Sequence, residues 1–247
     1  MSMRPIHTRA EANKYRKSLV KVLLCTFLTF MTGIALGLIF HNVIIIIAMV
    51  VIIGICSAIG GVYWTHYIIW DTGAIGEEVV AKCLVQITGI YHVINDIKIP
   101  GGGNIDHIVL TKGGIYVIET KNVNGNITCN GDNWERIKIG RQGTPYTAYI
   151  GSPSKQVKGN ALFISKFIQS HSREIFNKLN VRIWVAAILV FANDEANIAL
   201  FNPTVPVLRL NELSNYIETS SAKYLYTNDE LSIILKIIEK ELVQTSL

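Results

Sequence analysis

The sequence has no Asp, Glu, Lys or Arg from Val22 to Trp70. This uncharged stretch of 49 residues is too long for a single membrane span, because a helix rises ~1.5 Å per residue and a bilayer core is about 30 Å thick. Two spans with a short return fit instead, and His41-Asn42 is the least apolar place for the return. The expected segments are a basic arm at 1–21 and a transmembrane hairpin within 22–70, with helices at 22–40 and 43–67.

Small and aromatic residues favour this hairpin. Small residues four apart let two helices pack closely, and three such pairs occur: Gly33 with Gly37, Gly54 with Ala58, and Ser57 with Gly61. Trp64, Tyr67 and Trp70 fall near the end of the second span, where amphipathic rings prefer the headgroup layer. A cleaved signal peptide is the alternative, but its apolar stretch would be shorter and would end at a small-residue cleavage site.

Acidic residues are scarce before the hairpin. Six basic residues precede it against one acid, Glu11, and the loop between the spans has no charge. By the positive-inside rule, both termini are expected in the cytoplasm. The sequence therefore predicts a multi-pass protein of a bacterial cytoplasmic membrane.

Cysteine is also infrequent, and its four occurrences show no disulfide or metal-ligand spacing. The part after Asp71 has 17 basic and 16 acidic residues. The basic isoelectric point therefore comes from the basic residues before the hairpin and does not indicate a nucleic-acid surface. A phosphate-binding surface then requires local clustering. The candidates, which a solvated face would explain equally, are Lys138, Arg141, Lys155, Lys158 and Lys166.

The remaining residues are enough for one domain with a core. Apolar periodicity predicts helices at 73–90, 153–170, 210–219 and 228–242, the last capped by Asn228. Strands are expected at 91–99, 105–110, 115–121 and 183–191, with weaker ones near Ile127 and Trp134 and an edge strand at 205–208. The expected class is an α/β fold with a mixed sheet, whose core at 73–191 runs helix, three strands, helix, strand. Residues 192–247 are expected to add a strand and helices to it.

Three charged residues mark the ends of two of these strands. Glu119 and Lys121 project from one face of their strand, because side chains alternate with period two. The turn at 111–114 should bring Asp106, on the preceding strand, opposite Glu119. The three groups would then converge at a rim of the sheet, where α/β sheets generally have their sites.

These residue types suit phosphodiester hydrolysis. Two carboxylates can hold Mg²⁺ while leaving positions for water and a phosphate oxygen. Lys121 would orient the attacking water or stabilise the transition state, and Glu77, at the start of the first soluble helix, would add a ligand or hold a water. Each residue also has a structural explanation: Glu119 and Lys121 as a surface ion pair, Asp106 as a cap of the turn at 101–103, and Glu77 as a partner of the helix dipole.

The combination of motifs resembles a known family. The motifs are Gly73-Ala74-Ile75-Gly76-Glu77, Ile105-Asp106-His107, Gly114 to Asn122 with Gly125, and Pro153 with Gln156. Over 73–170 the chain is similar to the NERD, or nuclease-related, domain, a branch of the PD-(D/E)xK phosphodiesterase superfamily. The resemblance implies a restriction-endonuclease-like core, Mg²⁺ or Mn²⁺ as cofactor, and catalytic roles for Asp106, Glu119 and Lys121 with Glu77 and Gln156 beside them. Asp106, Glu119 and Glu77 would be the metal ligands.

The sequence departs from the family pattern at two positions. Ile105 stands where the superfamily is named for a proline, although Ile-Asp is common in this branch. Gly151-Ser152-Pro153 replaces the usual Asn-Pro, which leaves the role of Gln156 open.

Two functions of different class follow. The first is a membrane-anchored, metal-dependent nuclease acting on DNA, with RNA as an alternative substrate. The second is an inactive nuclease fold that binds nucleic acid or a protein at the membrane, as a monomer or a homo-oligomer. A nucleotide-binding enzyme is disfavoured, because Gly101 to Gly103 neither precede Gly-Lys-Ser/Thr nor open a helix.

Overall fold

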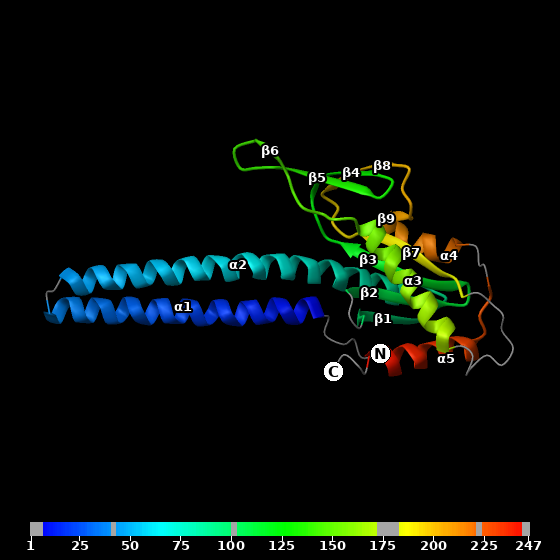
Figure 1. The fold of residues 1–247 in the computed structure, drawn as a ribbon, viewed down its shortest axis with the longest axis horizontal. Coiled ribbons are helices and arrows are strands. Elements are labelled where there is room, and N and C mark those ends of the chain that lie inside the picture. The colour runs from blue at the N-terminus through cyan, green and yellow to red at the C-terminus, as the bar shows by residue number, and fades with distance from the viewer. Residues whose placement is uncertain (1–6, 41–42, 100–102, 172–182, 221–223, 244–247) are drawn as a thin grey trace. The chain divides into compact units, whose positions relative to one another are not determined.

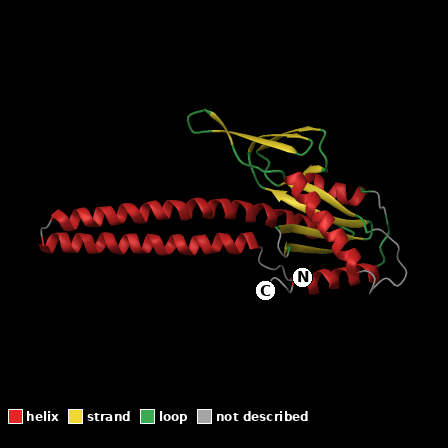
Figure 2. Ribbon diagram, viewed as in Figure 1, coloured by secondary structure: helices red, strands yellow, loops and turns green. Residues whose placement is uncertain are grey.

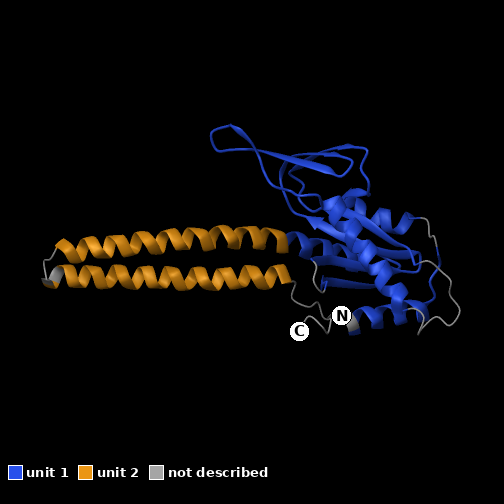
Figure 3. Cartoon of the chain, viewed as in Figure 1, with its two compact units in different colours: residues 1–4, 75–247 blue, residues 5–74 orange. Residues whose placement is uncertain are grey.

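A computed structural model describes residues 7–40, 43–99, 103–171, 183–220 and 224–243. It contains two compact units, one within residues 5–74 and one within residues 75–247 (Figure 3). The glycine-rich turn predicted at 101–103 lies mostly outside the described residues.

The first unit is a hairpin of two helices, α1 (His7–Phe40) and the first part of α2 (Val43–Gln86), which lie side by side (Figure 1). Both are long and apolar enough to cross a membrane, judged by length and composition. Gly33 allows close packing as predicted, since a Cβ there would meet Met49 at 3.2 Å. The expectation for Gly54 and Gly61 is wrong: no described atom lies within 4 Å of a Cβ at either position.

Polar and aromatic contacts join the charged ends of the hairpin. Arg9 forms an ion pair with Asp71, and the rings of Tyr15 and His66 stack with centroids 5.0 Å apart. These contacts continue the pairing of the two helices beyond the uncharged stretch. The helical part of α1 therefore includes most of the basic arm.

The predicted break between helices at 43–67 and 73–90 is wrong, because α2 is one helix from Val43 to Gln86. No proline interrupts this segment, and a single glycine such as Gly73 costs only about 1 kcal/mol in a helix interior. The helix ends just before Gly89, whose φ of +83° is the left-handed conformation that favours glycine after a helix.

The second unit is built on a five-stranded mixed sheet (Figure 2). Its strands in spatial order are β1 (Ile90–Lys98), β2 (Asn104–Thr111), β3 (Gly114–Lys121), β7 (Val185–Phe191) and β9 (Val207–Arg209). The first three form an antiparallel meander, and β7 and β9 join in parallel. The predicted order of helix, three strands, helix and strand is confirmed, and β7 lies between β3 and β9.

Helices cover both faces of this sheet (Figure 1). On one face, α3 (Pro153–His171) and α5 (Asn228–Ile237) bury Ile164, Leu231 and their neighbours against Val117. On the other, the last turns of α2 and the helix α4 (Leu213–Thr219) bury Leu84 and Leu213. Residues after 192 thus complete the core of this unit.

A second sheet was only partly predicted. It consists of β6 (Pro145–Thr147), β5 (Asn133–Ile139), β4 (Gly125–Asn130) and β8 (Ala196–Phe201), in that order. The weak strands near Ile127 and Trp134 correspond to β4 and β5. Strand β6 is short and fully exposed, and β8 buries only its first residue, so neither has the apolar alternation by which a strand is recognised.

The carboxyl-terminal helices differ in detail from the prediction. Residues 210–219 form a 3₁₀ turn, Leu210–Glu212, followed by α4, and α5 continues as a π-helical segment, Ile238–Val243. The expected cap Asn228 is the first residue of α5; Thr227 is the cap. Thr227 Oγ1 accepts from Glu230 N at 3.2 Å, and Thr227 N donates to Glu230 Oε2 at 2.7 Å, a reciprocal pair that satisfies two free helix-end donors.

Gly76 tests how closely α2 must approach β3. A Cβ at this position would lie 2.4 Å from Asn122 Cβ, so Gly76→Ala should lower the free energy of unfolding by roughly 1–3 kcal/mol, the usual cost of overpacking. The matched control is Gly159→Ala in α3, where no described atom lies within 4 Å of the new Cβ. It should stabilise the chain by about 0.5–1 kcal/mol. Thermal unfolding of the full chain in detergent compares them, and equal midpoints would contradict the close approach.

Candidate active site

The three charged residues predicted from the sequence meet at the carboxyl end of β3. Strands β2 and β3 pair His107 with Ile118 and Ile108 with Val117, and this register continued by one position sets Asp106 across from Glu119. The predicted pairing is therefore confirmed. Glu119 and Lys121 follow Val117 on the strand face that α3 covers.

Hydrogen bonds fix the three side chains. Asp106 Oδ2 accepts from the backbone N–H of Thr120 at 2.7 Å, so its carboxylate is directed at β3. Lys121 Nζ donates to Glu119 Oε1 at 2.6 Å and to Gln156 Oε1 at 3.5 Å. Glu119 is 2% exposed, and its pair with Lys121 is consequently unlike an ordinary ion pair on an exposed strand.

The second carboxylate oxygen of Glu119 has an unusual environment. Oε2 is buried and has no hydrogen-bond partner among the described residues. A buried acceptor without a partner loses its hydration without compensation, which costs about 1–3 kcal/mol and more when the group is charged. Such an atom is where a bound cation would restore the lost interaction.

The two buried acidic groups, Asp106 and Glu119, both have a raised pKa. Burial raises the pKa of Asp106 well above its usual value, and the nearby charge of Glu119 raises it further against the opposing effects of Thr120 N–H and Lys121. Burial also raises the pKa of Glu119, more than Lys121 lowers it. For Lys121, burial would lower the pKa, but the surrounding acids outweigh burial and raise it, so its amine stays protonated.

Glu77 and Gln156 reach this region from the two helices that flank β3. Gly76 packs against Asn122, which follows Lys121 in the chain. The negative charge of Glu77 contributes to the raised pKa of both Glu119 and Lys121. Gln156 belongs to the first turns of α3. The structure thus brings all five predicted residues to one end of the sheet.

A buried histidine that received no role from the sequence supports the site from the opposite strand face. His107 Nδ1 lies 2.7 Å from Asn95 Oδ1, and His107 Nε2 lies 3.2 Å from Thr120 Oγ1. Burial lowers the pKa of His107 to about 3, so the ring is neutral, with Nδ1–H donating to Asn95 and Nε2 accepting from Thr120. The backbone N–H of Thr120 in turn holds Asp106. The one signal in the sequence is a polar residue inside an apolar strand.

Residues 72–192 match the family model of the nuclease-related domain, NERD. This segment is a NERD domain. The match spans all five site residues and extends past residue 170, the limit of the resemblance seen in the sequence, to include β7. Comparison with curated proteins found no match, and comparison with solved structures found none either.

A divalent metal, as the NERD domain suggests in general, fits the acidic pair. Burial raises the pKa of both Asp106 and Glu119, the charge of Glu119 raises that of Asp106 further, and Glu119 Oε2 has no hydrogen-bond partner among the described residues. A cation stabilises such an environment. Within the residues that the structure describes, no group of three or more His, Cys, Asp or Glu side chains is arranged to hold a metal ion. Two carboxylates can hold a divalent ion while its other positions are taken by water and substrate.

Asp106→Asn tests whether the ionised, buried Asp106 carboxylate destabilises the NERD domain in the absence of metal. Because the folded-state pKa of Asp106 is raised, its ionised form opposes folding at neutral and alkaline pH, and the penalty disappears as the pH falls toward the unfolded pKa near ~4. Without metal, Asp106→Asn should unfold at a higher temperature than wild type at pH 8, and the difference should vanish toward pH 4.

Metal should reverse this ranking. Mg²⁺ at ten times its Kd would stabilise wild type by about 1.4 kcal/mol and the variant much less. The thermal unfolding midpoints of wild type and variant, each measured with EDTA and with Mg²⁺ at both pH values, test both expectations. A variant that is less stable than wild type without metal at pH 8 would contradict the mutual repulsion of Asp106 and Glu119.

Proposed function

We propose that the chain is a metal-dependent nuclease that hydrolyses phosphodiester bonds of DNA. The observation that carries the proposal is the buried Glu119 carboxylate, which has one oxygen paired with Lys121 and one without a described partner, beside Asp106. A further cation at the second oxygen would offset the cost of burying this carboxylate in its ionised form. RNA contains the same phosphodiester group and is an alternative substrate.

Asp106 and Glu119 would hold Mg²⁺, or Mn²⁺ in its place, and Glu77 would add a ligand or hold a water. Bound there, the metal would supply a water of lowered pKa and neutralise charge on the phosphate. Lys121, which stays protonated, would orient the attacking water or donate to the phosphate oxygen that gains negative charge. Gln156 would hold the Lys121 amine in position by accepting one of its hydrogen bonds.

The second candidate is a nuclease fold without activity that binds nucleic acid or a protein partner. Two observations favour it: the part after Asp71 is nearly neutral, with 17 basic and 16 acidic residues, and the described residues contain no closed metal-ligand group. In this case the acidic pair would be a remnant of the family's site.

The proposed setting is a bacterial cytoplasmic membrane. Residues 22–70 would form the transmembrane hairpin. The basic amino-terminal segment at 1–21, the nuclease core at 73–191 and the carboxyl-terminal addition at 192–247 would lie on the cytoplasmic side. The length and apolar character of α1 and α2 support the anchor, and the basic residues before it support the orientation. The substrate would then be DNA that lies near the membrane.

Cleavage by the purified full chain tests the activity. Linear, circular and single-stranded DNA would be incubated with Mg²⁺, with Mn²⁺ and with EDTA. Asp106→Ala and Lys121→Ala should each reduce the rate by about 10²–10³, the usual loss when one charge-stabilising group is removed.

Asp229→Ala and Lys236→Ala, at exposed positions of α5, are the matched controls and should cleave like wild type. Equal residual cleavage by all variants would identify a contaminant and refute the enzyme. Salt-sensitive DNA binding without metal-dependent cleavage by wild type would establish the inactive module instead.

A reporter fused after Leu247 tests the orientation. In bacterial cells, alkaline phosphatase at this position should be inactive and green fluorescent protein should be fluorescent, because the former needs the periplasm and the latter folds in the cytoplasm. Moving the fusion to His41, in the loop between the spans, should reverse both signals. An active phosphatase after Leu247 would refute the cytoplasmic placement.

A further inference from the structure

The basic residues of the second unit are concentrated in one stretch of the chain. Residues 136–171 contain six Lys and Arg and no acid, whereas the rest of the part after Asp71 has eleven basic and sixteen acidic residues. The near-neutral total therefore hides a segregation of charge. The six basic residues are Arg136, Lys138, Arg141, Lys155, Lys158 and Lys166.

This stretch begins with a projecting hairpin, which we call the arm and define as residues 137–149. It comprises the end of β5, the turn at 140–144 and β6 (Figure 1). Backbone hydrogen bonds between Gly140 and Thr144, and between Gly143 and Gly140, close the turn. The arm is mostly exposed: Tyr146 is 49% and Tyr149 92% accessible.

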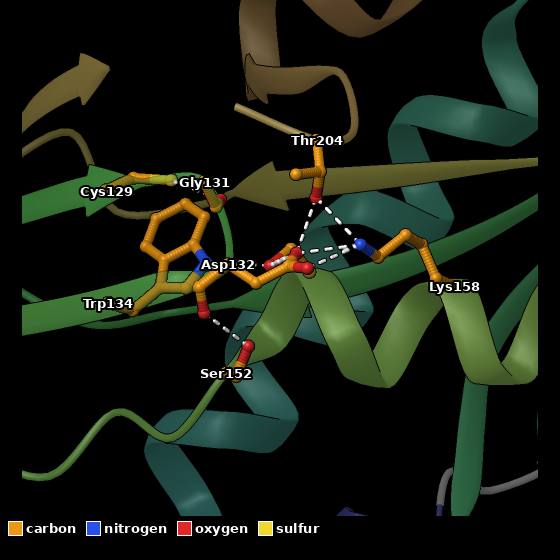
Figure 4. Close-up of polar contacts among 8 residues, drawn as sticks. Cys129, Gly131, Asp132, Trp134, Ser152, Lys158 and Thr204 are labelled. Atoms are coloured by element: carbon orange, nitrogen blue, oxygen red, sulfur yellow. Dashed lines mark hydrogen bonds and ion pairs between the residues drawn. The ribbon is translucent and has the colours of Figure 1, made fainter. Parts of the chain in front are cut away.

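A polar cluster around Asp132 joins the start of β5, the strand from which the arm extends, to α3 (Figure 4). Lys158 Nζ donates to both carboxylate oxygens of Asp132, at 2.8 and 2.7 Å, and Ser154 Oγ donates to Oδ1 at 2.7 Å. Trp134 Nε1 donates to Ser154 Oγ at 2.9 Å. These bonds join β5 to the first turns of α3, and they assign Lys158 a structural partner.

A second set of contacts places the beginning of the arm, at Arg136 and Ile137, beside the segment that follows the candidate active site. Arg136 Nε donates to Asn124 O at 2.8 Å, three residues after Lys121. Gly125 has a φ of +103°, and a Cβ there would meet Ile137 O at 2.7 Å. The arm therefore leaves the fold next to the segment that continues from the charged end of β3.

The arm and the segment that returns from it carry both basic and aromatic side chains. Lys138 pairs with Tyr146 across the two strands, so the two side chains share a face. Arg141 lies in the turn. The ring of Tyr149 lies beside Gly151, two residues before α3, since a Cβ on Gly151 would be 3.3 Å from Tyr149 Oη. Lys155 follows in the first turn of α3, next to Gln156. All five groups are exposed or half-buried, and the last of them, Lys155, precedes Gln156, which accepts from Lys121 of the site.

We propose that the arm binds a nucleic-acid strand that has unpaired bases and directs it to the candidate active site. Lys138, Arg141 and Lys155 contact phosphates, and Tyr146 and Tyr149 stack on bases. Cations that follow the backbone and rings that stack on bases are the common features of single-strand binding, whereas a duplex exposes no base face for stacking. This proposal rests on the proposed function only for the delivery of the strand; the binding itself does not require catalysis.

Fluorescence anisotropy of the full chain in detergent tests the binding. The parent is the Asp106→Asn protein in EDTA, so that no strand is cut, and the probes are a short labelled oligothymidylate and the same strand in a duplex. Removing both rings, Tyr146→Ala with Tyr149→Ala, should weaken single-strand binding at least about tenfold and affect the duplex much less. Lys138→Gln with Arg141→Gln should weaken both and reduce the salt slope of single-strand binding by about 1.4.

Matched controls are Tyr91→Ala, an exposed ring on β1, and Lys236→Gln, an exposed lysine on α5, and both should bind like the parent. Arm variants that bind like the parent overturn the proposal. So do equal losses for single strand and duplex when the rings are removed, or binding of the parent to phosphatidylglycerol vesicles that these substitutions abolish while oligothymidylate binding persists. Absence of cleavage by wild type together with arm-dependent binding would refute the nuclease and leave the arm established.

Discussion

The register between β2 and β3 determines where the charged groups of the site lie. The pair His107–Ile118 sets Asp106 across from Glu119 on one strand face, and both carboxylates lose hydration there, which raises the pKa of each. A shift of one residue would turn the side chains of one strand to the opposite face. The apolar residues that fix the register therefore also hold the two acids together against their mutual repulsion.

Neutral and cationic groups offset this repulsion from two sides. Lys121 is ion-paired with Glu119 on the charged face. On the other face, the neutral His107 bonds Thr120, whose backbone N–H bonds Asp106. Because a ring with a pKa of about 3 stays uncharged at neutral pH, this support adds no charge to the site. Glu119 Oε2 still has no hydrogen-bond partner among the described residues, and a divalent cation would stabilise the negative charge there.

The predictable parts of the molecule are those that local sequence specifies. Apolar alternation and the turn after Thr111 were enough to pair Asp106 with Glu119, and helical periodicity located α3 and its Gln156. The long-range features were missed: α2 continues through Gly73 where a break was expected, and β8 pairs with β4 across a separation of about seventy residues without a buried face of its own. Support from His107 likewise depends on Asn95 of a third strand, which no spacing in the sequence indicates.

Net charge was a poor guide because it sums two surfaces that the fold keeps distinct. Asp106, Glu119 and Glu77 gather at the end of β3, where a polyanion would be repelled unless cations lie close by. Lys121 is already committed to Glu119, and Lys158 to Asp132. Cations on the arm and at the start of α3 are available to attract a phosphate backbone. A site of paired acids and an adjacent stretch without a single acid thus fit one physical requirement: metal and strand both need to be attracted, by opposite charges, to neighbouring positions.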